Sequence, residues 1–199
     1  IQLVLEVVPR RLLAEGGGLW RGVTICLLAG GIVGHLAASA SIWKEKRVSV
    51  GKGGDLFWGE SLVDRRIVVV QRSVDYLQEA MGPQETLAVI PDGTMLNYQI
   101  RRRNPTPHLL TGPWDMRAAG GDRVVTRDFQ KNPPDWIVVT TDDPGVHGMG
   151  GFGSAGYGKE LAEWIRGNYQ NAATIHEPSQ TVAGGYGMSI LRRKSVKAP

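Results

Sequence analysis

The sequence has one cysteine, no fixed glycine period and no strong excess of either charge, and each shortage excludes a class of protein. A single Cys among 199 residues cannot form a disulfide within the chain, and Cys26 lies alone in an apolar run. The 27 glycines follow no repeat, which excludes a collagen, and a hydrophobic share of 42% is too high for a disordered chain. The length therefore fits a globular domain with an appendage.

Charge and histidine content give no sign of nucleic acid or metal. Lys and Arg total 23 against 19 Asp and Glu, so the net charge is only +4. The basic clusters, such as Arg192-Arg193-Lys194, are short and accompany no recognised nucleic-acid-binding motif. The four histidines, His35, His108, His147 and His176, show no metal-ligand spacing. We therefore expect no nucleic-acid partner, no metal and no cofactor.

One long stretch has no charged residue. Residues 22–43 read GVTICLLAGGIVGHLAASASIW, without Asp, Glu, Lys or Arg. A helix of this length spans about 33 Å, close to the roughly 30 Å hydrocarbon core of a bilayer. Trp43-Lys44 is typical of an interfacial anchor, and the Gly30 and Gly34 spacing would let another membrane helix approach closely. We predict a transmembrane helix at 22–43; a buried core helix and an uncleaved signal anchor are the alternatives.

The rest of the chain divides around this helix. Residues 1–21 are predicted to be a loop or the end of a preceding span, because the chain starts at Ile1 with an apolar run, as a piece of a longer polypeptide would. Residues 44–60 are charged and rich in glycine, which is typical of a linker. Residues 61–199 are predicted to form an extramembrane domain. Basic residues flank the helix on both sides, so the positive-inside rule gives no orientation.

Helix and strand patterns alternate in the predicted domain. Ser61 and Asp64 resemble a capping box at the start of an amphipathic helix, which Gly82-Pro83 would end. Further apolar patterns predict helices at 94–103, 122–131 and 159–169, and strands at 86–90, 136–141, 172–177 and 186–192, the last two joined across 183–185. The fold class is therefore α/β: a layered domain with a mostly parallel sheet and an antiparallel edge.

A glycine-rich stretch, residues 145–158, invites a nucleotide-binding interpretation. Gly151-x-Gly153-x-x-Gly156 formally matches a dinucleotide fingerprint. However, these glycines begin ten residues after the predicted strand ends at Thr141, rather than directly after it. We therefore favour a flexible loop, with nucleotide binding as the alternative. Asp142-Asp143 is interpreted as a surface turn, because adjacent carboxylates on a strand point to opposite faces.

A different segment, NYQIRRRNPTP at 97–107, supplies the candidate binding residues. Three consecutive arginines can hold a phosphate or a carboxylate through bidentate hydrogen bonds. The alternative is a solvated helix end near a membrane surface. No catalytic residue is predicted. The predicted binding residues are Asn97, Tyr98, Arg101, Arg102, Arg103, Asn104 and Thr106.

Three runs carry a resemblance to a known family. They read LAVIPDGTMLNYQIRRRNPTP, GDRVVTRDFQKNPPDWIVVTTDD and FGSAGYGKELAEWIRGNY. Together they resemble the C-terminal region of bacterial multi-spanning membrane glycosyltransferases, which are similar to the dolichyl-phosphate-mannose protein mannosyltransferases and the lipid-A aminoarabinose transferases. The resemblance covers roughly residues 20–193, and it departs from the family in the glycine-rich loop and in 108–119.

The resemblance implies a C-terminal accessory domain of an inner-membrane glycosyltransferase with a polyprenyl-phosphate sugar donor. It further implies that the domain lies outside the cytoplasm, against lipid and upstream transmembrane helices of the same polypeptide. The family's catalytic carboxylate belongs to an N-terminal loop that this chain does not contain, so no residue here inherits that role. One alternative is a single-span anchored α/β domain with a binding or structural role and no catalysis. Another, a soluble nucleotide-binding enzyme, requires 22–43 to be a core helix.

Overall fold

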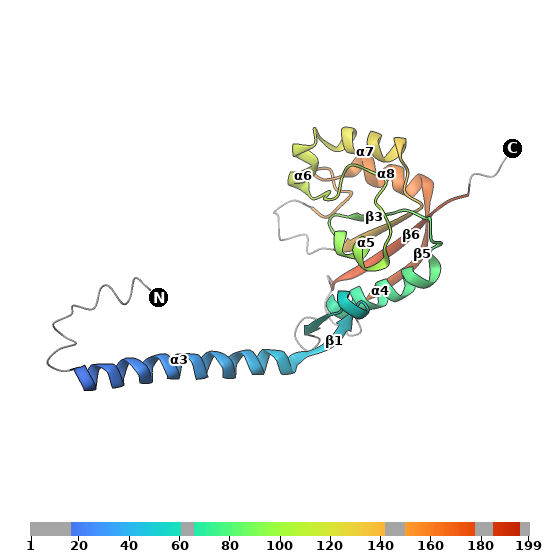
Figure 1. Ribbon diagram of the computed structural model, residues 1–199. Helices are drawn as coiled ribbons and strands as arrows, with labels where there is room; N and C mark the ends of the chain where they lie inside the picture. Colours follow the sequence, from blue (N-terminus) through green and yellow to red (C-terminus); the bar gives the residue numbers. More distant parts are fainter. Residues whose placement is uncertain (1–16, 61–65, 142–149, 178–184, 196–199) are drawn as a thin grey trace. The chain divides into compact units, whose positions relative to one another are not determined.

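The computed structural model describes residues 17–60, 66–141, 150–177 and 185–195, and the chain forms two compact units, Ile1–Lys46 and Arg47–Pro199. The described part of the first unit is mainly one long helix, α3 (Gly17–Glu45) (Figure 1). Its 26 residues from Trp20 to Glu45 are long and apolar enough to cross a membrane, and its apolar window is not buried at all. The Lys46 ammonium lies 4.3 Å from the ring centroid of Trp43, at the end where an interfacial anchor was predicted.

The segment interpreted as a linker contains regular structure. After the end of α3 it forms β1 (Lys46–Val50), the short 3-10 helix η1 (Gly53–Asp55) and β2 (Phe57–Glu60). The two strands pair with each other in a sheet of their own. Val50 is fully buried in the hydrophobic core of the second unit. The second unit thus begins directly where α3 ends. The glycine content of this segment had predicted a linker, and the hairpin was not predicted.

The main sheet has four strands in the order β3-β4-β6-β5. They are β3 (Leu87–Ile90), β4 (Trp136–Thr141), β5 (Tyr169–His176) and β6 (Gly187–Arg193), which confirms the four predicted strands. The pair β3 and β4 is parallel, whereas β4 with β6 and β6 with β5 are antiparallel. A mostly parallel sheet is therefore not confirmed: the described sheet is mixed. The predicted β5-to-β6 turn falls partly on 178–184, outside the described residues.

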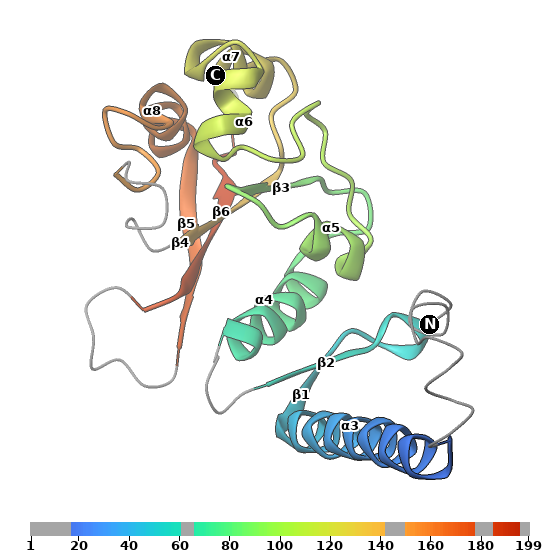
Figure 2. The ribbon, with the colours of Figure 1, turned by 90° about the vertical axis from the view of Figure 1, so that its left-hand side faces the viewer.

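Helices cover both faces of this sheet (Figure 2). One face packs against α4 (Arg66–Ala80) and α5 (Thr94–Ile100), and the other against α6 (Pro113–Ala118), α7 (Asp122–Lys131) and α8 (Lys159–Asn168). Alternation along the strands explains the two cores, since Leu87 and Val89 face α4 while Ala88 and Ile90 belong to the opposite cluster. The predicted layered α/β architecture is confirmed.

The predicted helices are present, with some differences at their ends. The first predicted helix corresponds to α4, whose proposed capping residues Ser61 and Asp64 lie outside the described residues. The helix predicted over 94–103 ends earlier, at Ile100, because Arg101 takes a left-handed conformation with φ of 55°. The short helix α6 was not predicted; Pro113 begins it, and six residues give too little periodicity to detect.

Candidate functional site

Six of the seven predicted binding residues surround one hollow beside α5. The hollow has a volume of about 340 Å³, and Thr94 and Leu109 complete its lining. The seventh residue, Thr106, is buried in the loop that follows. The structure therefore brings most of the predicted residues together, and whether they bind a ligand stays a prediction. The hydrogen bonds, however, divide these residues into two groups.

Three of the predicted residues serve the local structure. The Asn97 side-chain amide donates to the carbonyl of Leu87 at 2.8 Å, which holds α5 against the start of β3. The Asn104 carboxamide oxygen accepts from both the N–H and the hydroxyl of Thr106, each at 2.9 Å. These bonds form an Asx-type turn that shapes the loop. The hydrogen bonds of all three side chains thus lie within the protein.

Arg102 also has a structural role. Its guanidinium donates to the carbonyl of Ile100 at 3.0 Å and to that of Met81 at 3.3 Å. These two carbonyls lie at the ends of α5 and α4, where helix carbonyls have no partner within the helix. A positive charge at a helix C-terminus is also favoured by the helix dipole. Arg102 therefore links the ends of two helices.

The other two arginines are exposed and differ from each other. Arg101 forms an ion pair with Asp55, and its guanidinium carbon lies 4.2 Å from the ring centroid of Tyr98. The Tyr98 hydroxyl donates to the same Asp55 carboxylate. This hydrogen bond, together with the charge of Arg101, lowers the pKa of Asp55 below its ordinary value. Arg103 is exposed, and its side chain makes no hydrogen bond or ion pair with the described residues.

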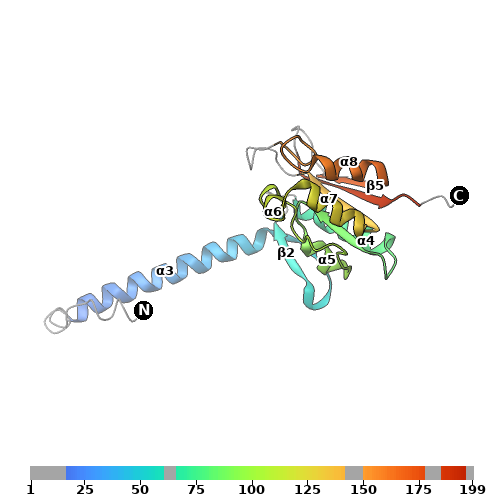
Figure 3. The ribbon, with the colours of Figure 1, turned by 90° about the horizontal axis from the view of Figure 1, so that it is seen from above.

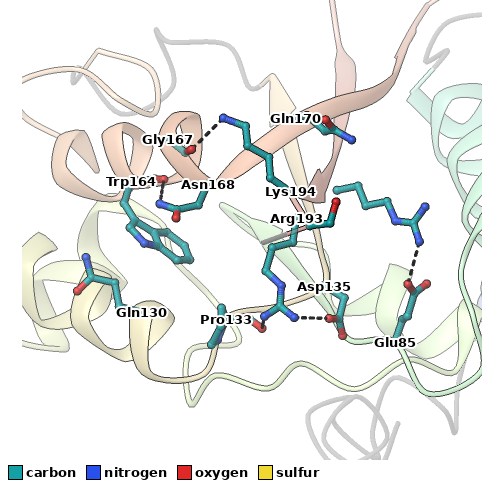
Figure 4. Close-up of a pocket in the computed structure, with 12 residues that line it drawn as sticks. Glu85, Gln130, Pro133, Asp135, Trp164, Gly167, Asn168, Gln170, Arg193 and Lys194 are labelled. Carbon is teal, nitrogen blue, oxygen red and sulfur yellow. Dashed lines mark hydrogen bonds and ion pairs between the residues drawn. The ribbon is translucent and has the colours of Figure 1, made fainter. Parts of the chain in front are cut away.

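A larger groove, of about 800 Å³, lies at the edge where β3 and β4 begin (Figure 4). Its charges are paired with each other: Arg193 with Asp135 at 3.1 Å, and Arg192 with Glu85 at 3.4 Å. The Lys194 ammonium donates to a carbonyl at the end of α8 at 2.8 Å. The basic cluster is visible in the sequence, but its acidic partners Glu85 and Asp135 are distant in the chain, and the pairing of β6 with β4 brings the two groups together.

The pKa of Glu85 reflects this environment. Burial raises it, but hydrogen bonds from the Gly82 N–H and the Trp136 indole, with the nearby Arg192 charge, outweigh burial and lower the pKa below its ordinary value. The Trp136 indole nitrogen lies 2.9 Å from the Glu85 carboxylate. Glu85 is therefore an ionised structural group and not a proton donor near neutral pH.

The described part of the glycine-rich stretch, residues 150–158, does not offer the phosphate site of a dinucleotide fold. Residues 142–149, with Asp142 and Asp143, lie outside the described residues. The described glycines form a tight turn that leads into α8, in which the Gly153 N–H donates to the carbonyl of Tyr157 at 2.8 Å. The N–H groups of Glu160 and Leu161, in the first turn of α8, already donate to the Asp122 carboxylate at 2.7 and 3.3 Å. A carboxylate at this position repels a phosphate.

Within the described ranges, no group of three or more His, Cys, Asp or Glu side chains is placed to hold a metal ion. Comparison of the chain with protein-family models, curated proteins and solved structures finds no match. The candidate site therefore rests on two features of the chain itself: a groove whose charges are paired, and an exposed segment around α5 that includes Arg103, which has no partner among the described residues.

Proposed function

We propose that this chain is a C-terminal accessory part of an integral inner-membrane glycosyltransferase that uses a polyprenyl-phosphate sugar donor. The supporting observation is that α3, long and apolar enough to cross a membrane, is followed without an intervening residue by the first strand of a folded α/β domain. A domain attached in this way is kept near the bilayer surface, where the phosphate of a lipid-linked sugar lies.

In this proposal the domain lies outside the cytoplasm and contacts lipid and upstream helices of the same polypeptide. Arg103 and the outer side of Arg101 are the groups available to a donor phosphate, because Arg102 is occupied by helix carbonyls. The finer expectation for the fold, a mostly parallel sheet, is not part of this proposal. In this proposal the catalytic residue lies elsewhere in the polypeptide, and this chain positions the donor or the acceptor.

The test is sugar transfer by the whole polypeptide that the gene encodes, assayed in membranes with a polyprenyl-phosphate sugar. The double variant Arg101→Gln, Arg103→Gln should raise KM for the donor while leaving the amount of membrane-inserted protein unchanged. Arg127→Gln, at an exposed position on α7, is the matched control for loss of charge. An unchanged KM in the double variant refutes the role of the arginines, and no sugar transfer by the unmodified polypeptide refutes the glycosyltransferase proposal.

A second candidate function is a single-span anchored domain with a binding or structural role and no catalysis. It is favoured by the internal pairing of the groove charges, which leaves no unpaired acid or base there among the described residues. The two candidates differ in one outcome. If the whole polypeptide transfers no sugar but stays in the membrane fraction after alkaline extraction, the second candidate function is supported.

A further inference from the structure

We infer that one face of the second unit rests on the headgroup region of an anionic lipid bilayer. This docking face consists of six exposed large hydrophobic residues, and the inference rests on the proposed membrane attachment through α3. The residues are Leu56, Trp58, Met95, Tyr98, Leu109 and Leu110.

Exposed large hydrophobic side chains gather in two short parts of the second unit. In its described part, every one of them lies in 56–58 or 95–114. Leu109 is 59% exposed and Tyr98 is 52% exposed. Single exposed apolar residues scattered over a surface are normal, whereas their concentration on one part of it marks an interaction surface. The helices α7 and α8 contribute none.

The two segments adjoin each other. Tyr98 on α5 and Arg101 directly after α5 both bind the Asp55 carboxylate, and Gln99 donates to the Asp55 carbonyl at 3.0 Å. Asp55 directly precedes Leu56, so the hairpin packs beside α5, as the positions of β2 and α5 in Figure 3 also show.

Neighbouring hollows connect the rest of the face. Met95 and Leu110 line a hollow of about 280 Å³, and Tyr98 and Leu109 line the hollow of about 340 Å³ described above. Thr94 lines both hollows, so they lie next to each other. The face is thus a continuous surface formed by the hairpin, α5 and the loop that precedes α6.

The residue types on this face suit a bilayer surface. Tryptophan and tyrosine are enriched at the membrane–water interface, where a ring can lie in the apolar layer with its polar group in water. Arg103, exposed and unpaired among the described residues, adjoins this surface and suits an anionic headgroup. Asp92 lines the other hollow, so we place the anionic contact at the Arg103 side.

Chain connectivity favours lipid over a soluble protein partner. Because β1 begins at Lys46, directly after the last residue of α3, a membrane-inserted α3 keeps the second unit beside the bilayer. Tethering of this kind raises the effective concentration of the surface without any new contact.

The experiment measures nitroxide depth in the full chain, reconstituted in phosphatidylcholine vesicles containing phosphatidylglycerol. The probe position is Leu109→Cys in a Cys26→Ser background, with Arg127→Cys on α7 as the matched control. A third sample carries the nitroxide on the native Cys26 and reports on α3. We expect the labels at positions 109 and 26 to be relaxed more by oxygen than by a water-soluble nickel complex, and the control to show the reverse.

The outcomes separate the two proposals. If the label at position 109 is as accessible to nickel as the control, while the label on Cys26 is in lipid, the docking face is refuted and the membrane anchor stands. If the label on Cys26 is also in water, both fail. Spin–spin broadening at position 109 would show a second copy of the chain as the occupant and would refute the lipid contact.

Charge is tested separately. Adding Arg103→Gln to the position 109 probe should lower the ratio of docked to undocked domain by about fivefold, the effect of one arginine near an anionic surface. Vesicles without phosphatidylglycerol should remove this difference between the variants. Equal docking of both variants on anionic vesicles contradicts the assigned contribution of Arg103.

Discussion

Replacing each of the three consecutive arginines by Ala should change the free energy of unfolding by different amounts, because the three side chains have different partners. Arg102→Ala removes the charged donor that binds the carbonyls of Ile100 and Met81. Hydrogen bonds from a charged donor each contribute about 1.5–3 kcal/mol, and the Nε of Arg102 is buried without a partner among the described residues, which offsets part of that gain. We therefore expect a loss of about 2 kcal/mol.

Arg103→Ala is the matched control. Its side chain has no described partner, so stability should stay within about 0.5 kcal/mol of the unmodified chain. For a unit of this size, the loss in Arg102→Ala corresponds to a fall in Tm of about 4–8 °C. Arg101→Ala should fall between the two, because its ion pair with Asp55 is exposed.

The assay is urea and thermal unfolding of the full chain in detergent, followed by near-UV circular dichroism, which reports on the packed second unit. Equal stability of Arg102→Ala and Arg103→Ala would refute the structural role of Arg102. It would also return Arg102 to the group of residues available to a ligand.

Two further predictions concern the acidic residues that the sequence analysis did not single out. Asp122→Ala removes the carboxylate that accepts hydrogen bonds from the first turn of α8, and losing this cap should lower the stability by about 1 kcal/mol. The same unfolding assay measures it, with Asp115→Ala, at an exposed position on α6, as the control. Equal unfolding midpoints of the two variants would contradict the capping role of Asp122. Glu85 has a lowered pKa in the folded chain, so its contribution is present above its ordinary value of 4.5 and is lost as the pH falls through the lowered pKa. Glu85→Gln should therefore flatten the decline of the urea midpoint on the acid side, and an equally steep decline in both proteins would show that Glu85 does not govern it.

The strands and most helices of the second unit followed from the sequence because their signals are local. The run 136–141, for example, is short and apolar and follows Pro133-Pro134, a combination that is typical of a buried strand. The helix α7 matches its predicted bounds because Gly121 and Asn132 flank an amphipathic pattern on both sides.

What the sequence did not provide depends on contacts between distant residues. No local sequence pattern indicates that β6 lies between β4 and β5, and this position makes the sheet mixed. The distinct roles of the arginines depend on where α4 ends and where the hairpin places Asp55. The first strand of the hairpin, Lys46–Val50, has a local signal, because its valines alternate with polar residues. The four glycines nearby nevertheless favoured a linker.

The position of β6 has a consequence for synthesis. Although β6 is the last strand of the described chain, it occupies the interior of the sheet and hydrogen-bonds to strands on both sides. A ribosome delivers β3, β4 and β5 before the strand that joins β4 to β5 exists, so until then β4 and β5 both expose an unpaired edge. The domain must therefore complete its fold after nearly all of it has been made, and a stop codon shortly before residue 187 would remove the middle of the sheet.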